Sequence, residues 1–300
     1  MFLLAQIVGI FVIDAYNGEG LGERSSALTL PFGLGESGGS DIISLIFSIV
    51  LTVVIFFLLM KYDLKFIIRS WFFLVILLAL TVSFNSFIPS TFVYSLIMAG
   101  ILGLVFTILK IFRPSILIHN GTEVLIYPGV AAIIAPLINV TGIIILLIII
   151  ALYDAWAVWH SGIMQKMAKY QMEEARIFGG FLIPHLDKKT REKIKKLKQK
   201  YTKKELSKKF KNKKFKIRLA ILGGGDVVFP IIAMGVFMRA FPLASLFGIR
   251  GLIPALFILA GSFIALVHLL LVTKKDKAYP AMPWISSGAL IGMLVWWLIF

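Results

Sequence analysis

Long runs of apolar residues recur along the whole chain and limit its fold more than any other feature. About 20 apolar residues are needed to cross a bilayer as a helix, and the 300-residue chain is 59% hydrophobic and only 15% charged. We therefore predict an all-α integral membrane protein with nine transmembrane helices. The predicted spans are residues 1–15, 42–60, 65–84, 91–112, 123–138, 141–163, 217–238, 249–272 and 280–299. For the first of them, a cleaved signal peptide is the alternative.

The positive charge of the chain is concentrated in one connection between spans. Of the 31 Lys and Arg residues, 20 lie within residues 164–218, together with only 5 of the 15 acidic residues. Because positively charged connections stay on the cytoplasmic side, we predict a cytoplasmic N-terminus and an extracytoplasmic C-terminus. The chain then divides into an N-terminal half with the first six spans (1–163), a basic cytoplasmic loop (164–216) and a C-terminal half with the last three (217–300).

Composition also argues against several kinds of function. The basic stretch 186–216 of this loop is expected to be a solvated, partly helical linker or to lie on anionic lipid headgroups, and its aromatic residues are too sparse to stack nucleic-acid bases. We therefore expect no nucleic-acid partner. The chain has no cysteine, which rules out disulfides and thiol catalysis. Its four histidines are scattered without metal-ligand spacing, so we expect no metal and no cofactor.

Two acidic residues, Asp154 and Asp226, lie well inside predicted spans. Each is nine residues from the cytoplasmic end of its span, at a depth of about 14 Å for a helical rise of 1.5 Å per residue. The two spans are consecutive and antiparallel, so we expect the carboxyls to face each other. The other acids considered fall at or near span ends: Asp14, Asp41, Asp63, Glu123 and Asp276.

A carboxylate at membrane depth costs roughly 2.5–3.5 kcal/mol or more, so the pair requires an explanation. Two carboxyls in contact cannot both ionise readily, and they can share a proton. Aspartic proteases use this arrangement: one carboxylate takes a proton from water while the other acid donates to the scissile carbonyl. The structural alternative is a neutral carboxylic acid that hydrogen-bonds a neighbouring helix.

Three short motifs accompany the aspartates in a characteristic order. Tyr153 precedes Asp154 in "LYDAW" of the sixth span, and Gly223, Gly224 and Gly225 precede Asp226 in "GGGD" of the seventh. The ninth span begins with "YPAMPW", which contains Pro280, Ala281, Met282 and Pro283.

With these motifs the whole chain resembles the presenilin and signal peptide peptidase family of GxGD intramembrane aspartyl proteases, and within it a prokaryotic, archaeal presenilin homologue. That family has Y-D, G-x-G-D and P-A-L in its sixth, seventh and ninth spans. Met282 stands where the family has Leu, a change of similar volume. A literal "PAL" at residues 254–256 lies toward the outer end of the eighth span, and we treat it as a coincidence.

The resemblance implies that Asp154 and Asp226 are catalytic, and the neighbouring motifs would shape the site. Gly223 and Gly225 would let an unwound substrate approach closely, although close helix packing also explains glycine. Pro280 and Pro283 would leave carbonyls unpaired for an extended substrate, or they simply start a helix. Tyr153 would flank the pair, or form an interhelical hydrogen bond.

The expected function is therefore that of an aspartic endopeptidase that cuts the transmembrane helices of membrane-protein substrates. We expect a multi-pass protein in the plasma membrane of a prokaryote, in contact with lipid. The sequence leaves open whether the protein forms a homo-oligomer. The alternative is a proton- or cation-coupled transporter, because acids within the membrane often relay protons. Against it, the sequence shows no inverted repeat and no polar partner deep in other spans. A catalytically idle scaffold would leave the aspartate pair without a purpose.

Overall fold

The computed structural model describes residues 1–17, 51, 65–89, 92–112, 115–161, 179–185, 218–272 and 279–300. All of the predicted span 42–60 except residue 51, and most of the basic loop, lie outside these residues. The count of nine spans and the orientation of the termini therefore stay predictions. The described elements are α1 (Phe2–Asn17), α4 (Lys65–Phe87), α5 (Ser95–Phe112), α6 (Ile116–Ile134), α7 (Val140–Trp156), β1 (Gly180–His185), β2 (Arg218–Gly223), α11 (Gly224–Ala240), α12 (Leu252–Val272) and α13 (Met282–Ile299).

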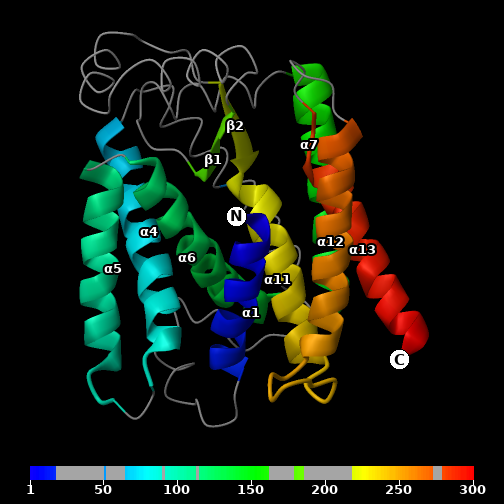
Figure 1. Cartoon of the computed structure of the whole chain (residues 1–300), viewed down its shortest axis with the longest axis horizontal. Helices are drawn as coiled ribbons and strands as arrows, with labels where there is room; N and C mark the ends of the chain where they lie inside the picture. Colours follow the sequence, from blue (N-terminus) through cyan, green and yellow to red (C-terminus); the bar gives the residue numbers. More distant parts are fainter. Residues whose placement is uncertain are drawn as a thin grey trace, which may run out of the picture.

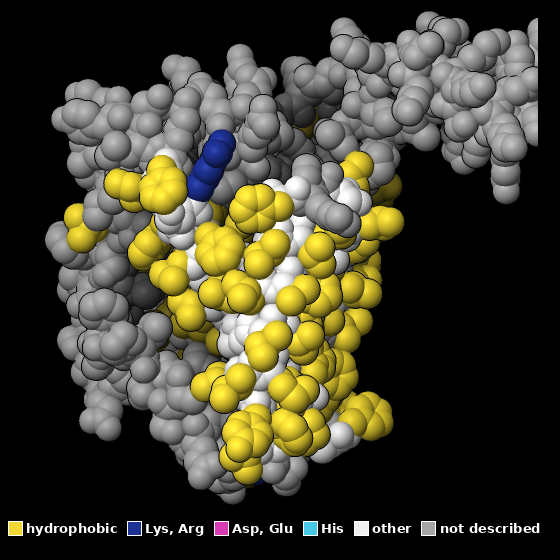
Figure 2. Space-filling view, turned by 90° about the vertical axis from the view of Figure 1, so that its left-hand side faces the viewer, with side chains coloured by type: hydrophobic (Ala, Val, Ile, Leu, Met, Phe, Trp, Pro, Cys, Tyr) yellow, Lys and Arg dark blue, Asp and Glu magenta, His cyan; other side chains and the backbone are white. Residues whose placement is uncertain are grey.

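The helices are those of a membrane protein. Five of them, α4, α5, α6, α12 and α13, are long and apolar enough to cross a bilayer, and α1 and α7 are shorter apolar helices. Large hydrophobic side chains on α4 and α5 are exposed, among them Trp71, Ile101 and Phe112. Figure 2 shows hydrophobic side chains over most of the described surface on the α5 side, with basic side chains only toward the end that carries the strands. In a bilayer this surface would face lipid.

Helix α11 is the centre of the bundle. It contacts α1, α6, α7, α12 and α13, and its side chains from Ile231 to Met238 are buried without interruption. Figure 1 shows α4 and α5 on one side of this centre, α7, α12 and α13 on the other, and the two strands at the end where α11 begins. A helix that is buried all round is surrounded by other helices. These helices fix the position of α11 and therefore also the position of its first residues.

The seventh predicted span is not a single helix. Residues Arg218–Gly223 form β2, which pairs antiparallel with β1 in the register Gly180↔Gly223 to His185↔Arg218, and the helix begins only at Gly224. Consecutive glycines each cost about 1 kcal/mol in a helix, whereas pairing with β1 provides the backbone partners that a strand needs. The predicted loop 164–216 therefore contributes strand β1, and Asp226 is the third residue of α11.

Two further spans differ from their predicted limits. Helix α7 ends at Trp156 and continues as a π-helical turn over Ala157–Ser161, so Asp154 lies in the last α-helical turn. Helix α6 begins at Ile116, seven residues before the predicted start of its span, and is followed by a 3₁₀ turn at Ala135–Leu137. Glu123, predicted at a span end, is therefore inside the helix, and it is 2% exposed.

Helices α12 and α13 approach each other through glycine. A Cβ atom on Gly261 of α12 would overlap the Gly288 carbonyl, and one on Gly292 would overlap the Phe257 carbonyl. Gly288 and Gly292 are four residues apart on α13, the spacing at which small residues let membrane helices meet closely.

We expect Gly288→Ala to destabilise the protein by about 1–3 kcal/mol, because the added methyl meets the Gly261 backbone, which cannot move aside without separating the helices. The matched control is Gly100→Ala on α5, where nothing lies within 4 Å of the added Cβ. There the better helix propensity of alanine predicts unchanged or slightly raised stability, by up to about 1 kcal/mol. Thermal unfolding of both variants in one detergent measures the difference, and equal melting temperatures would contradict the packing.

Candidate active site

Asp226 lies in the first turn of α11, with Gly223 as the residue that caps the helix. The backbone N–H of Gly223 donates to the Asp226 carboxyl, and a Cβ on Gly223 would lie 3.0 Å from Asp226 Oδ2. An acid at the third helical position commonly reaches back to the N–H of the capping residue, and the positive end of the helix dipole favours it there. The residue as a whole is partly exposed, and its carboxyl is held by backbone.

Asp154 lies in the last turn of α7, and its side chain is held by the start of a different helix, α13. Its side chain is 4% exposed, and its Oδ2 accepts a hydrogen bond of 3.1 Å from the backbone N–H of Met282. Met282 is the first residue of α13, and Pro283 follows it. Free N–H groups at a helix start bind anions, and proline is favoured there because it lacks an N–H that would go unpaired.

The two carboxyls interact electrostatically. The structure therefore brings together Asp154 on α7, Asp226 on α11 and the first residue of α13, three segments that the sequence predicts to form one site. Asp154 accepts a hydrogen bond from the backbone of α13, and Asp226 accepts one from the backbone at the junction between β2 and α11. Within the described ranges, no three His, Asp or Glu side chains lie close enough to hold a metal ion.

The three glycines before Asp226 have different surroundings. Gly223 lies against the Asp226 carboxyl, and a Cβ on Gly224 would lie 3.1 Å from the ring and 3.2 Å from the hydroxyl oxygen of Tyr127. Gly225 is exposed, and a Cβ added to it would lie 3.5 Å from the Phe229 ring. Only Gly225 thus has the open side that a close approach of substrate requires. Gly223 itself precedes the helix, as its capping residue.

The structure gives the surroundings of two other predicted shaping residues. Tyr153 is 47% exposed, and its ring lies 6.4 Å from that of Trp156, on the outside of α7. The Ala281 carbonyl already accepts the first hydrogen bond of α13, from Ile285. An extended substrate at this loop would therefore have to use the carbonyls of Tyr279 and Pro280.

The structure adds residues that the sequence did not single out. Tyr127 of α6 is 4% exposed and interacts electrostatically with both Asp226 and Glu123. Glu123 in turn forms an ion pair of 2.6 Å with Lys110 of α5. The signal was present in the sequence: Glu123 and Tyr127 are four residues apart, on one face of a helix. The predicted start of the span at residue 123 concealed it.

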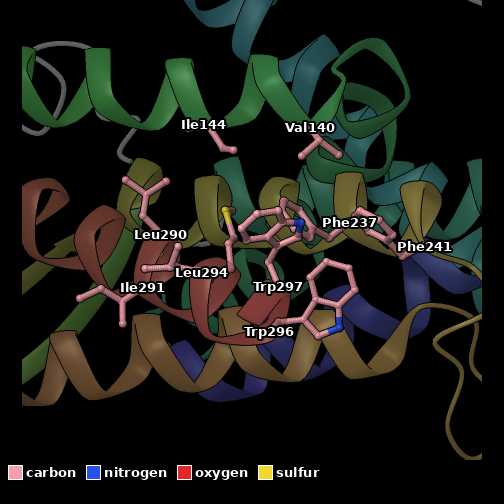
Figure 3. Close-up of a pocket in the computed structure, with 10 residues that line it drawn as sticks. Val140, Ile144, Phe237, Phe241, Leu290, Ile291, Leu294, Trp296 and Trp297 are labelled. Atoms are coloured by element: carbon pink, nitrogen blue, oxygen red, sulfur yellow. The ribbon is translucent and has the colours of Figure 1, made fainter. Parts of the chain in front are cut away.

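A large apolar cavity lies elsewhere, between α7, α11 and α13. Its volume is about 560 Å³, and Figure 3 shows its lining side chains converging from the three helices. The lining residues are Val140, Ile144, Phe237, Phe241, Leu290, Ile291, Met293, Leu294, Trp296 and Trp297. They are ten or more residues along α7 and α11 from the aspartates, about 15 Å at helical rise, so this cavity is not where the acids meet.

The chain is similar to known proteins in both sequence and fold. The family model described as signal-peptide peptidase, presenilin aspartyl protease matches residues 35–300. Two solved structures of a presenilin family intramembrane aspartate protease share the fold, with TM-scores of 0.62 and 0.61 and sequence identities of 18% and 17%. Each match covers 100% of this chain, and 97% and 96% of the other. No curated protein matches. On the match over residues 35–300, the chain belongs to the signal-peptide peptidase and presenilin family of aspartyl proteases.

Proposed function

We propose that this protein hydrolyses peptide bonds within transmembrane helices of other membrane proteins, with Asp154 and Asp226 acting as one catalytic pair. Its family makes it an aspartic endopeptidase embedded in the membrane. The observation that carries the proposal is that α7 and α11, which contact each other, present two carboxyls close enough to interact electrostatically. Residence in the plasma membrane of a prokaryote stays a prediction.

The proposed chemistry needs one shared proton and one water molecule. The ionised carboxyl takes a proton from water, whose oxygen attacks the scissile carbonyl carbon, while the protonated carboxyl donates to the carbonyl oxygen. A tetrahedral diol forms. Its collapse breaks the C–N bond, with one proton passing from the diol to the leaving nitrogen through the carboxyls, and releases an acid and an amine. The pair titrates as a unit, so neither acid is assigned one fixed role.

Strand β2 supports the proposal because it leads directly into Asp226. Among the described residues, β2 pairs only with β1, which leaves its other edge unpaired. A substrate helix hides its peptide bonds in hydrogen bonds and must unwind before it is cut. Addition of the unwound segment to the edge of β2 would replace the lost hydrogen bonds and direct a peptide bond past Gly225 toward the carboxyls.

We expect Asp154→Asn and Asp226→Asn each to lower cleavage of a single-span peptide by about 10²–10⁴-fold or more, because neither amide can transfer the proton. The matched control is Asp14→Asn on α1, whose Oδ1 accepts from the backbone N–H of Arg250 at 3.2 Å and is kept by asparagine. The measurement is product formation by purified protein, analysed by mass spectrometry. Continued cutting by both site variants would refute the assignment.

We also expect the substrate's own helix stability to control the rate. Replacing two alanines by glycines beside the cut position removes about 2 kcal/mol of helix stability, so kcat/KM should rise by up to about 30-fold if unwinding precedes cleavage. The same pair of glycines placed two helical turns away from the cut is the control. Equal rates for all three peptides would show that the substrate need not unwind.

One buried ion pair bears on the alternative of a proton- or cation-coupled transporter. Lys110 and Glu123 form it, but Lys110 lies in the last turn of α5, so the expectation that no basic or polar partner lies deep in other spans stays a prediction. Uptake into proteoliposomes driven by a pH gradient, without any proteolysis, would favour this alternative. Membership of a protease family favours the endopeptidase.

A further inference from the structure

The hairpin that leads into α11 needs support from the rest of the protein. Within the described residues it has only two strands, β1 and β2, and a lone two-stranded hairpin is at best marginally stable. Helix α6 contacts β1, and the fully buried Phe181 of β1 packs edge-on against Tyr127 of α6, with ring centroids 5.4 Å apart. Apolar packing of this kind is non-directional, so it holds the strand against the helix without fixing where the strand lies along it.

A directional contact comes from His119, on the same helix. Its Nε2 lies 2.8 Å from the Gly180 carbonyl oxygen, and since a carbonyl only accepts, the ring nitrogen donates. The same nitrogen lies 3.6 Å from Glu123 Oε1, too far for a hydrogen bond, and that oxygen lies 2.6 Å from Lys110 Nζ. The shorter of these two contacts of the imidazole is therefore the one to the hairpin.

Gly180 is at the end of the hairpin that adjoins α11. It pairs with Gly223, which caps α11 and donates its N–H to the Asp226 carboxyl. Gly180 is buried, and its φ of +151° is one that residues with a Cβ rarely adopt. The His119 contact thus reaches the point where the hairpin, the helix cap and the acid meet.

We propose that His119 is a positioning residue that anchors the hairpin to α6 and thereby holds the N–H of Gly223 where it meets Asp226. The inference rests on the proposed function and extends the site to α6, outside the three motifs. Without the imidazole, a buried carbonyl loses this donor, and the end of the hairpin can shift relative to α6. Such a shift moves the cap of α11 and the free edge of β2 together, so the orientation of the acid and the addition of substrate are both impaired.

Two substitutions of His119 test the proposal in the full-length protein with a single-span peptide. His119→Leu removes the donor and should lower kcat/KM by about 3- to 10-fold, the effect of one hydrogen bond. His119→Gln places an amide N–H near the position of Nε2 and should keep kcat/KM within about twofold of the parent protein. Parent-like activity of His119→Leu, or no recovery in His119→Gln, would overturn the proposal.

The matched control is Ser83→Ala on α4. Ser83 is fully buried and donates from its hydroxyl to the Leu125 carbonyl of α6. This substitution also costs one hydrogen bond from a side chain to a backbone carbonyl, but that bond joins α4 to α6 rather than α6 to the hairpin. It should lower the melting temperature about as much as His119→Leu does and leave kcat/KM within about twofold. An equal fall of kcat/KM in both variants would mark a general loss of stability and contradict the anchor.

A double-mutant cycle tests whether the imidazole acts through Gly180. Gly180→Ala strains the start of β1, because alanine rarely adopts the φ found there, and should lower kcat/KM by itself. Addition of His119→Leu should then lower it by less than about twofold more, since groups that act through one another are not additive. A full additional loss would show that His119 acts elsewhere and would refute the proposed route.

Hydrogen–deuterium exchange keeps the inference separate from the activity. In His119→Leu the amides of β1 and β2 should exchange about 3- to 10-fold faster than in the parent protein, because the hairpin opens more often. The amides of α12 and α13 should be unchanged, and Ser83→Ala should leave the hairpin protected. Unchanged exchange of the hairpin would sink the inference even in a protein that cleaves peptides. Faster exchange in a protein whose parent cuts nothing would uphold the anchor and reject the proposed function instead.

Discussion

The structure depends on one requirement of the bilayer: a polar group within it must find its partner in the protein. The two carboxyls meet this requirement through backbone rather than through side-chain bases. Asp154 accepts from the first N–H of α13, and Asp226 accepts from the residue that caps α11. Backbone donors carry no full charge, so each acid is held while its ability to take and give a proton is kept. Helix starts at both sites are therefore part of the chemistry.

The same requirement explains the junction between β2 and α11. A continuous helix through residues 218–226 would satisfy its own backbone and place Asp226 in mid-helix, without free N–H groups nearby. The strand instead takes its hydrogen bonds from β1 and releases the helix start at the acid. The hairpin and α11 are thus one unit, and α6 contacts the hairpin through His119 and Tyr127.

Most helices could be predicted from apolar runs, because a helix that crosses a bilayer needs a minimum length and an apolar run of that length can be found in the sequence. The limits of α4, α5, α12 and α13 lie within about four residues of the predicted spans. The predicted helix limits were wrong where a helix contains polar residues or where a strand replaces part of a helix. Glu123 lowered the hydropathy of α6 and was placed at its edge, and the apolar residues before Gly223 suit a strand as well as a helix.

The sequence by itself determined that the chain lies in a membrane, that Asp154 and Asp226 stand out, and that the motifs around them resemble those of one protease family. These properties are local: they depend on residue type, spacing and order. Only the tertiary structure decided that Asp226 lies in the first turn of a helix, that Met282 meets Asp154, and that Tyr127 lies against Gly224. Such contacts join residues that are distant in sequence, as does the hydrogen bond from the Gln6 side chain to the Val227 carbonyl. Packing of helices against one another selects them, and no local pattern encodes that packing.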